Sequence, residues 1–413
     1  MELPTGPAAP RQWQTLRYAL RPYAFFRAAQ RRYGDVFTVK ILQETWVMVA
    51  GPQGVRAVLT VEPSQFLSGE ANQPLRPVIG TRNLLLLDGS EHMARRKLLL
   101  PSFHGERLRA HREVMAQVAR DELARWPRGS AFPLLPRMQA ITFEVIMRVV
   151  FGARAGEATA LRQALQRMQG WLTGPGGMAA YNLLGPERLP SWPPFRRMLE
   201  AIDREVAAQI ARRRAEPGED VVSMLVQTEG LEERDVRDEL LTLLVAGHET
   251  TTAALAWAFE ALMRHPDAYA RVAAREAGWA QAVVHESLRL RPPVPLVVRK
   301  LLAPLEVDGH LLPAGATAAP SSILLHVNPD LYPDPHAFRP ERWLERKPGT
   351  YEWIPFGGSM RRCLGASFAM LEIQTVLEEV AAAVPLRVPE PARERVWRRG
   401  IVLVPAHGAL AVI

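Results

Sequence analysis

One short stretch constrains this chain more than any other. Residues 356–365 read Phe-Gly-Gly-Ser-Met-Arg-Arg-Cys-Leu-Gly and contain the only cysteine of the 413 residues, Cys363. After Cys363, apolar residues recur at helical spacing as far as residue 380, and the opposite face carries Glu372, Glu378 and Glu379. The pattern therefore places the thiol at a helix N-terminus, where unpaired N–H groups and neighbouring arginines lower the pKa of a thiol. We expect a thiolate that is accessible near neutral pH.

A lone cysteine is by default an inert, buried side chain, and that interpretation has to be weighed first. The glycines around this sulfur favour another one. Gly357, Gly358 and Gly365 remove side chains from both sides of Cys363. A backbone without side chains can lie close against a large flat ligand.

Length and composition predict one large domain over residues 1–413, because no Gly/Ser linker or low-complexity tract divides the chain. Residues 1–30 form an aromatic and basic N-terminal arm. No run of about 18 uninterrupted apolar residues predicts a membrane span. A single cysteine is typical of a reducing compartment, so a cytoplasmic location is expected. The net charge of +8 includes 43 scattered acidic residues, which disfavours nucleic-acid binding and favours a basic docking face.

Short β patterns occur at Val36–Leu42, Trp46–Ala50 and Leu296–Leu301, the last after the helix-breaking segment 292–295. Segment 174–177, Gly-Pro-Gly-Gly, is not a dinucleotide loop, because no strand precedes it and it contains proline. We interpret it as a mobile connection.

A basic segment at residues 90–97 contains His92 and Arg96 at a spacing of four. On a helix these two side chains project from one face. Taken alone, the pair fits a solvated basic surface.

The predicted helix from Glu232 to Arg264 carries the unusual run Ala-Gly-His-Glu-Thr-Thr-Thr at residues 246–252. Glycine and three threonines are poor helix formers, and Thr250 can bond back to a carbonyl of the preceding turn. The run therefore predicts a notch in the helix. Two uses remain open: a packing notch made of small residues, or a buried proton relay in which Glu249 and Thr250 are the acid and the alcohol.

Glu286 and Arg289 stand three apart on another predicted helix, where an exposed pair would contribute only about 0.3–0.5 kcal/mol. Residues 338–343, Phe-Arg-Pro-Glu-Arg-Trp, supply the further arginine Arg342. Together, these motifs and the cysteine loop resemble the cytochrome P450 haem-thiolate monooxygenases, from about residue 30 onward and most densely after residue 240. Ser359 departs from the family pattern, which has glycine there. The turn at Ser359 must either accept a Cβ or adopt a negative φ.

The resemblance implies a mainly α fold with a small β region, in a single large α-rich domain of the cytochrome P450 type. It also implies haem b, with Cys363 as the axial ligand of the iron. The remaining cofactor-binding positions implied by the resemblance are His92, Arg96, Arg299, Arg361, Phe356, Gly365, Ala246 and Gly247.

The activity implied is insertion of one oxygen atom from O2 into an apolar small molecule, by hydroxylation or epoxidation. Thr250 would hydrogen-bond dioxygen, and Glu249 with waters would deliver protons. Glu286, Arg289 and Arg342 would form a buried triad bracing the cysteine loop. The substrate pocket would include Val294, Leu296, Val297 and Ile401.

Electrons would come from a separate ferredoxin or flavodoxin with its reductase, because no flavin, pyridine-nucleotide or iron–sulfur motif is present in the sequence. We expect a monomer. Two alternatives stay open: a peroxide-driven peroxygenase, which the Glu249 and Thr250 pair disfavours, and a haem-based sensor or carrier without turnover.

Overall fold

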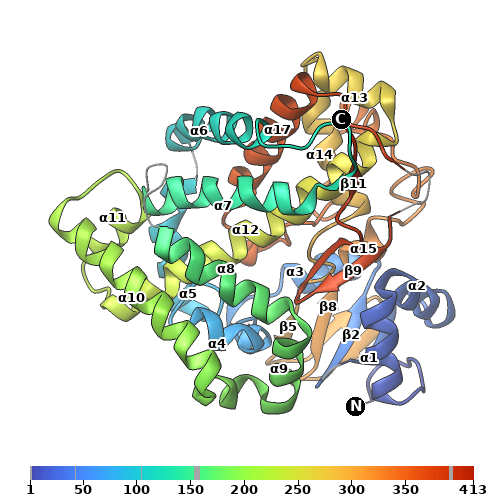
Figure 1. The fold of residues 1–413 in the computed structure, drawn as a ribbon. Helices are drawn as coiled ribbons and strands as arrows, with labels where there is room; N and C mark the ends of the chain where they lie inside the picture. The colour runs from blue at the N-terminus through green and yellow to red at the C-terminus, as the bar shows by residue number, and fades with distance from the viewer. Residues whose placement is uncertain (1, 42, 104, 153–158, 390–393) are drawn as a thin grey trace. The chain divides into compact units, whose positions relative to one another are not determined.

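The structure is a computed structural model that describes residues 2–41, 43–103, 105–152, 159–389 and 394–413 (Figure 1). The described residues group into two units. The first unit comprises Met1–Leu67, Phe103–Ile141 and Glu249–Ile413, and the second comprises Ser68–Ser102 and Thr142–His248. The prediction of one domain over residues 1–413, with an arm at residues 1–30, stays a prediction.

The described part of the first unit contains a five-stranded sheet in the order β1-β2-β8-β5-β3. The pairs β1/β2, β5/β8 and β3/β5 are antiparallel, and β2/β8 is parallel. The strands are β1 (Val36–Ile41), β2 (Glu44–Val49), β3 (Phe66–Leu67), β5 (Arg299–Leu301) and β8 (Thr317–Pro320). The two strands expected near the N-terminus are therefore present, although Leu42 lies outside the described residues. The third strand is shorter than expected, since it begins at Arg299.

Period-two alternation buries both faces of this sheet. Val36 and Val47 belong to one apolar cluster, and Phe37 and Met48 belong to another. Helix α2 (Pro22–Tyr33) contributes Phe25 to the second cluster. Two-stranded ladders also occur among the described residues: β4 (Phe132–Pro133) with β11 (Leu410–Ala411), β6 (Leu305–Val307) with β7 (His310–Leu312), and β9 (Val396–Arg399) with β10 (Val402–Pro405).

Helices make up more of the described chain than strands do, so the expectation of a mainly α fold is confirmed. The first unit holds α1 (Arg11–Leu20), α2 (Pro22–Tyr33), α3 (Pro52–Leu59), α6 (Gly105–Leu123), α13 (Pro266–Ala273), α14 (Trp279–Leu290), α15 (Ser322–Leu325), α16 (Arg342–Glu345) and α17 (Ala366–Ala383). Helix α6 lies beside α17 (Figure 1). Short 3₁₀ turns occur at Pro63–Gln65, Glu70–Leu75, Leu100–Phe103, Leu189–Ser191 and Ser359–Arg361.

The second unit holds α4 (Arg76–Ile79), α5 (Gly89–Leu99), α8 (Thr159–Thr173), α9 (Pro175–Arg188), α10 (Pro193–Ala215) and α11 (Val221–Val226). Helices α7 (Leu135–Phe151) and α12 (Glu233–Met263) belong partly to each unit. The expected mobile connection at residues 174–177 is wrong, because α9 begins at Pro175 with Gly174 as its N-cap. Proline at the first helical position lacks an N–H that would have no intrahelical partner anyway. No helix among the described residues is long and apolar enough to cross a membrane.

Helix α17 begins at Ala366, later than the sequence pattern suggested, so Cys363 precedes the helix by three residues. Glu378 and Glu379 are paired with Arg112 and Arg120 of α6, at 2.6 and 3.1 Å. Glu372 departs from the expected polar face, because it is buried and burial raises its pKa well above the ordinary value.

Candidate active site

The cysteine loop is closed by backbone hydrogen bonds. The N–H of Cys363 donates to the carbonyl of Phe356 at 2.8 Å, and the N–H of Gly357 donates to the carbonyl of Ile354 at 3.0 Å. A 3₁₀ turn over Ser359–Arg361 lies between them. Cys363 itself is exposed, in contrast to most cysteines without a disulfide, which are buried. The loop thus presents a thiol on a fixed backbone.

The turn at Ser359 accepts a Cβ and does not adopt a negative φ, which were the two options that the sequence left open. Its φ is +56°, so a residue with a Cβ occupies the left-handed region that the family pattern reserves for glycine. Gly357 also has a positive φ, +66°, and needs no Cβ there. The departure at Ser359 is therefore accommodated as local backbone strain.

The surroundings of Cys363 fit a flat ligand such as haem. A Cβ added at Gly365 would meet no atom within 4 Å, so the space beside this residue is open. On the other side of the loop, a Cβ on Gly358 would lie 2.9 Å from Cδ1 of Leu59. The loop is therefore packed tightly against its own unit at Gly358 and open at Gly365, next to the thiol.

A buried carboxylate, Glu286 of α14, lies at the centre of a dense network. Arg289 donates to it from Nε and Nη2, both at 2.8 Å, and Arg342 donates from Nε at 3.2 Å. Trp343 Nε1 and the backbone N–H of Arg339 add bonds of 2.9 and 2.8 Å. The structure thus brings together the three residues of the expected triad and adds Trp343 and Arg339 to them.

Arg289 also fixes the chain around the triad. Its guanidinium donates to the carbonyls of His326, Pro335 and Ala337 at 2.7, 2.7 and 3.1 Å. Neither Arg289 nor Glu286 has any exposed side-chain surface. A buried ion pair whose remaining donors are all engaged in this way holds loops in place as well as compensating its own charges.

Aromatic rings connect the triad to the cysteine loop. The ring centroids of Trp343 and Trp353 are 5.9 Å apart, and those of Trp353 and Phe356 are 5.8 Å apart. Trp353 is held by a 3.2 Å hydrogen bond from Nε1 to the carbonyl of His285. Since Phe356 accepts the N–H of Cys363, packed rings link Glu286 to the residue that carries the thiol.

His326 makes a second connection to the cysteine loop. The N–H of Ile354 lies 2.8 Å from His326 Nε2, and Nδ1 lies 3.2 Å from the carbonyl of Arg289. Nε2 must accept and Nδ1–H must donate, which defines a neutral imidazole. Burial, together with the charge of Arg289, lowers the pKa of His326 to about 3.

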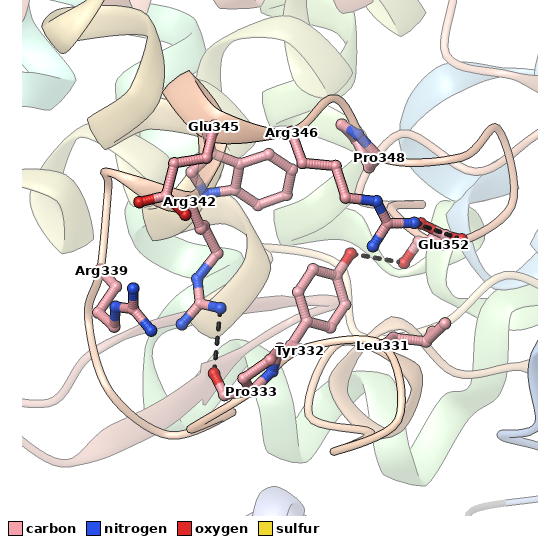
Figure 2. Close-up of a pocket in the computed structure, with 10 residues that line it drawn as sticks. Leu331, Tyr332, Pro333, Arg339, Arg342, Glu345, Arg346, Pro348 and Glu352 are labelled. Carbon is pink, nitrogen blue, oxygen red and sulfur yellow. Dashed lines mark hydrogen bonds and ion pairs between the residues drawn. The ribbon is translucent and has the colours of Figure 1, made fainter.

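A pocket of about 240 Å³ is lined by Arg342 of the triad, which Figure 2 shows pointing toward Pro333. The hydrogen bond between Arg342 Nη1 and the Pro333 carbonyl is 3.1 Å long. Arg346 closes one wall through an ion pair with Glu352 at 2.7 Å. Cys363 is not among the residues that line this pocket, so the pocket is separate from the thiol.

The acid of the α12 notch is engaged by Arg399, a pairing that no sequence motif predicted. Glu249 Oε2 lies 2.6 Å from Nη2 of Arg399, the last residue of β9, and Gln139 Nε2 lies 3.4 Å from Oε1. Burial raises the pKa of Glu249, and Arg399 opposes the shift. Thr250 follows on the same helix and is half-buried.

The helix remains α-helical through residues 246–252. Ala246 is exposed, although it lies in the middle of the helix, and Gly247 is half-buried. A Cβ on Gly247 would come within 3.2 Å of Cδ1 of Ile146 in the same unit. The notch is therefore formed by small side chains without a break in the helix.

Among the basic residues expected to bind the cofactor, Arg299 is buried, with its guanidinium carbon 4.8 Å from the centroid of Phe66. Arg361 is half-buried. In the second unit, His92 is buried on α5 and Arg96 is half-buried. The neighbouring Arg95 forms the buried ion pair of that helix, 3.1 Å from Glu239, whose pKa is raised by burial to about 7.

The expected substrate-pocket residues of the first unit are only partly covered. Val294, Leu296 and Val297 are half-buried, and Ile401 is 50% exposed. Leu403 ties their segments together, because its N–H donates to the carbonyl of Pro293 at 2.8 Å and its carbonyl accepts from Trp257 of α12 at 3.0 Å.

Known proteins are similar to this chain over nearly its whole length. A family model for cytochrome P450 matches residues 4–275 and 279–395. Cytochrome P450 135B1 of Mycobacterium tuberculosis strain H37Rv is 39% identical over 435 residues, which cover 99% of this chain and 91% of that protein. Cytochrome P450 137 of the same strain is 35% identical over 427 residues, covering 98% and 90%.

Solved structures show the same fold. The crystal structure of CYP175A1 from Thermus thermophilus is 30% identical, with a TM-score of 0.79 over 97% of each chain. A six-coordinated cytochrome P450 from another strain of Thermus thermophilus is 29% identical, with a TM-score of 0.74 over 95% of this chain and 98% of that one.

The helical fold, the cysteine loop and these matches define a haem enzyme. The chain belongs to the cytochrome P450 family. It is a cytochrome P450 monooxygenase, and relatives in this family generally use O2, a substrate and redox partners.

Proposed function

We propose that this monooxygenase binds haem b with Cys363 as the iron ligand and inserts one oxygen atom of O2 into an apolar small molecule, by hydroxylation or epoxidation. The observation that carries the proposal is the exposed thiol of Cys363 on a loop closed by the Phe356 carbonyl at 2.8 Å. When bound, a thiolate-ligated haem supplies the oxygen-activating chemistry, because electron density from the sulfur favours O–O cleavage.

The chain's own contribution at the sulfur is to hold it as a thiolate in one place. Arg361 and Arg362 lie two residues and one residue before Cys363, and positive charge favours the ionised thiol. The Glu286 network and the rings from Trp343 to Phe356 keep the loop from moving. Phe356 and Gly365 would then border the cofactor on the cysteine side.

The remaining cofactor contacts are assigned by charge and size. His92, Arg96, Arg299 and Arg361 would bind the propionates, since carboxylates buried with a macrocycle need charge-assisted partners. Ala246 and Gly247 would leave room for the flat face. The apolar side chains of Val294, Leu296, Val297 and Ile401 would contact the substrate.

Glu249 and Thr250 would handle protons. A carboxyl group whose pKa burial raises holds a proton closer to neutral pH, as a proton donor requires. The Thr250 hydroxyl both donates and accepts, so it can pass that proton on and orient the acceptor. The electrons would come from a separate ferredoxin or flavodoxin.

The carbon-monoxide complex of the reduced protein tests the ligand assignment. We expect the red-shifted Soret band of thiolate ligation in the wild type and its loss in Cys363→Ser. Ser359→Gly serves as the control, because it alters the same loop without touching the sulfur. An unchanged spectrum in Cys363→Ser would refute the assignment.

A further inference from the structure

Glu249 and Arg399 form an ion pair in which both partners are largely covered. The Nη2 to Oε2 distance is 2.6 Å, and the side chains are 17% exposed for Arg399 and 16% for Glu249. Nε of Arg399 is also buried, and it has no hydrogen-bond partner among the described residues. Arg399 therefore has donor capacity beyond its bond to Glu249.

Arg399 ends a strand at the base of an exposed turn. It pairs in register with Val402, and the intervening Gly400 has a φ of +61° while Ile401 is half exposed. The neighbouring Arg398 projects from the opposite face of the strand, toward the ring of Tyr18 at 5.4 Å. Only Arg399 of these two residues faces Glu249 of α12.

The hairpin is fixed in this position. Leu403 of β10 is bonded on one side to Pro293 and on the other to Trp257 of α12. The turn of the same hairpin carries the half-exposed Ile401, and the segment after Pro293 carries the half-buried Val294 and Leu296. The guanidinium of Arg399 thus belongs to a hairpin that is bonded to a segment with apolar side chains.

Such an arrangement discriminates between ligands by charge. A neutral apolar molecule that displaced Glu249 would leave the guanidinium buried and uncompensated, which is strongly unfavourable. A molecule that brings its own carboxylate would keep the charge of Arg399 paired. The planar fork of arginine matches a carboxylate with two parallel bonds.

We propose that Arg399 recognises a carboxylate at one end of an otherwise apolar substrate, and that this carboxylate takes the place of Glu249 as the partner of Arg399. The inference rests on the proposed function and names the substrate class for it: amphipathic organic acids. Ile401 and the apolar residues after Pro293 contact the body of the substrate. Arg399 is then a specificity-determining residue.

Replacement of Glu249 by a substrate carboxylate as the partner of Arg399 changes the pKa of Glu249. Arg399 is a cation placed against one oxygen of Glu249, and the neutral Gln139 lies at the other oxygen. Without the opposing charge of Arg399, the pKa of Glu249 rises further, so its carboxyl group keeps a proton to higher pH. Binding of the acid therefore favours the protonated form of Glu249, the proposed proton donor, while substrate is present.

The test compares matched ligands on the holoenzyme. Straight-chain acids of increasing length, ending with dodecanoate, are titrated beside the corresponding primary alcohols at pH 7, by calorimetry and by the spin-state shift of the haem. We expect at least one acid to bind about tenfold more tightly than its alcohol, as expected of hydrogen bonds to a charged group. Calorimetry in two buffers of different ionisation enthalpy should show net proton uptake when an acid binds, and none when its alcohol binds.

Three variants decide the outcome. Arg399→Gln should remove the preference for acids, and Glu249→Gln should tighten acid binding and abolish the proton uptake. Arg395→Gln, an equal change of charge at an exposed position before the same strand, should alter neither. If Arg399→Gln does not fold, Glu249→Gln alone decides.

Equal affinity for acids and alcohols, or a preference that survives Arg399→Gln, would overturn the inference. That result leaves the proposed function intact as long as the carbon-monoxide spectrum shows thiolate ligation through Cys363. Loss of the thiolate signature would instead overturn the proposed function itself.

Discussion

Arg289 grips both carboxylate oxygens of Glu286, from Nε and from Nη2, at 2.8 Å each, and neither side chain reaches solvent. The two residues are one turn apart on α14, so the helix presents them to each other before any tertiary contact forms. The rest of the fold excludes water from the pair and adds hydrogen bonds from Arg342 and Trp343 to Glu286.

The first prediction concerns this pair. Glu286→Gln leaves the charge of Arg289 buried without its counter-charge, which should lower the free energy of unfolding by about 3–5 kcal/mol. The expected result is little folded holoprotein and an earlier urea transition. Arg31→Ala, at an exposed position on α2, should stay within about 0.5 kcal/mol of wild type. A Glu286→Gln transition as late as that of the Arg31 variant would show that the buried charge is not essential.

The second prediction concerns pH and His326. Its pKa is about 3 in the folded protein and about 6.5 when unfolded, so the unfolded chain binds the proton more readily between these values. The stabilisation from a neutral His326 is therefore complete above about pH 6.5 and is lost as the pH falls toward 3. At pH 5 this residue alone should lower the free energy of unfolding by about 2 kcal/mol relative to pH 7.

Urea titrations at both pH values measure this difference. His326→Gln should be less stable than wild type at pH 7 and should lose less stability on acidification. A parallel pH dependence in the two proteins would mean that His326 is not buried as a neutral imidazole.

The third prediction concerns Thr250. Thr250→Ala should keep haem and substrate binding, yet divert reducing equivalents into hydrogen peroxide, because the hydroxyl that passes on protons is gone. Glu249→Gln should slow turnover with a larger solvent isotope effect. Peroxide and product are measured per electron pair consumed. Full coupling and full rate in both variants would leave the notch of α12 as a packing feature only.

The fourth prediction concerns the electron donor. Arg362 of the first unit and Lys97 of the second are both exposed, and each is a candidate contact for the electron donor. Positive charge steers an acidic donor and raises its association rate, an effect that salt screens. Arg362→Glu and Lys97→Glu should therefore slow reduction by an acidic ferredoxin at low ionic strength, with the substrate-induced spin shift unchanged. Arg31→Glu is the control. A rate indifferent to salt and to both reversals would place the donor elsewhere.

The fifth prediction concerns Ser359. Placing a non-glycine residue in the left-handed region destabilises the folded state by about 1–2 kcal/mol. Replacing it with glycine removes this strain, but the larger conformational entropy of glycine in the unfolded chain offsets about 0.5–1 kcal/mol of the gain. Ser359→Gly should thus raise the free energy of unfolding by about 0.5–1 kcal/mol in urea titrations. A decrease would show that the Ser359 side chain has a compensating contact.

Local motifs predicted much of this molecule. Residues three or four apart on a helix meet whatever the fold, which is why Glu286 with Arg289 could be anticipated. The turn at Ser359 could be reduced to two options because sterics leave few conformations.

Contacts between distant segments could not be predicted in this way. Arg399 lies 150 residues from Glu249, and no periodicity relates a hairpin to a helix. Glu372 is polar, so the helical pattern assigned it to the exposed face of α17, yet tertiary packing buries it. Gly174 and Pro175 read as a loop by composition, although the same two residues are favourable as an N-cap and a first helical residue.

The residues of the Glu286 network are synthesised at different times. Trp343 follows Glu286 by 57 residues, and Cys363 comes later still. At a synthesis rate of roughly 5–20 residues per second, several seconds pass before the partners of this carboxylate leave the ribosome. Through that interval Glu286 has only Arg289 from its own helix and must remain hydrated. The core around α14 therefore cannot be completed before Trp343 has emerged, late in synthesis.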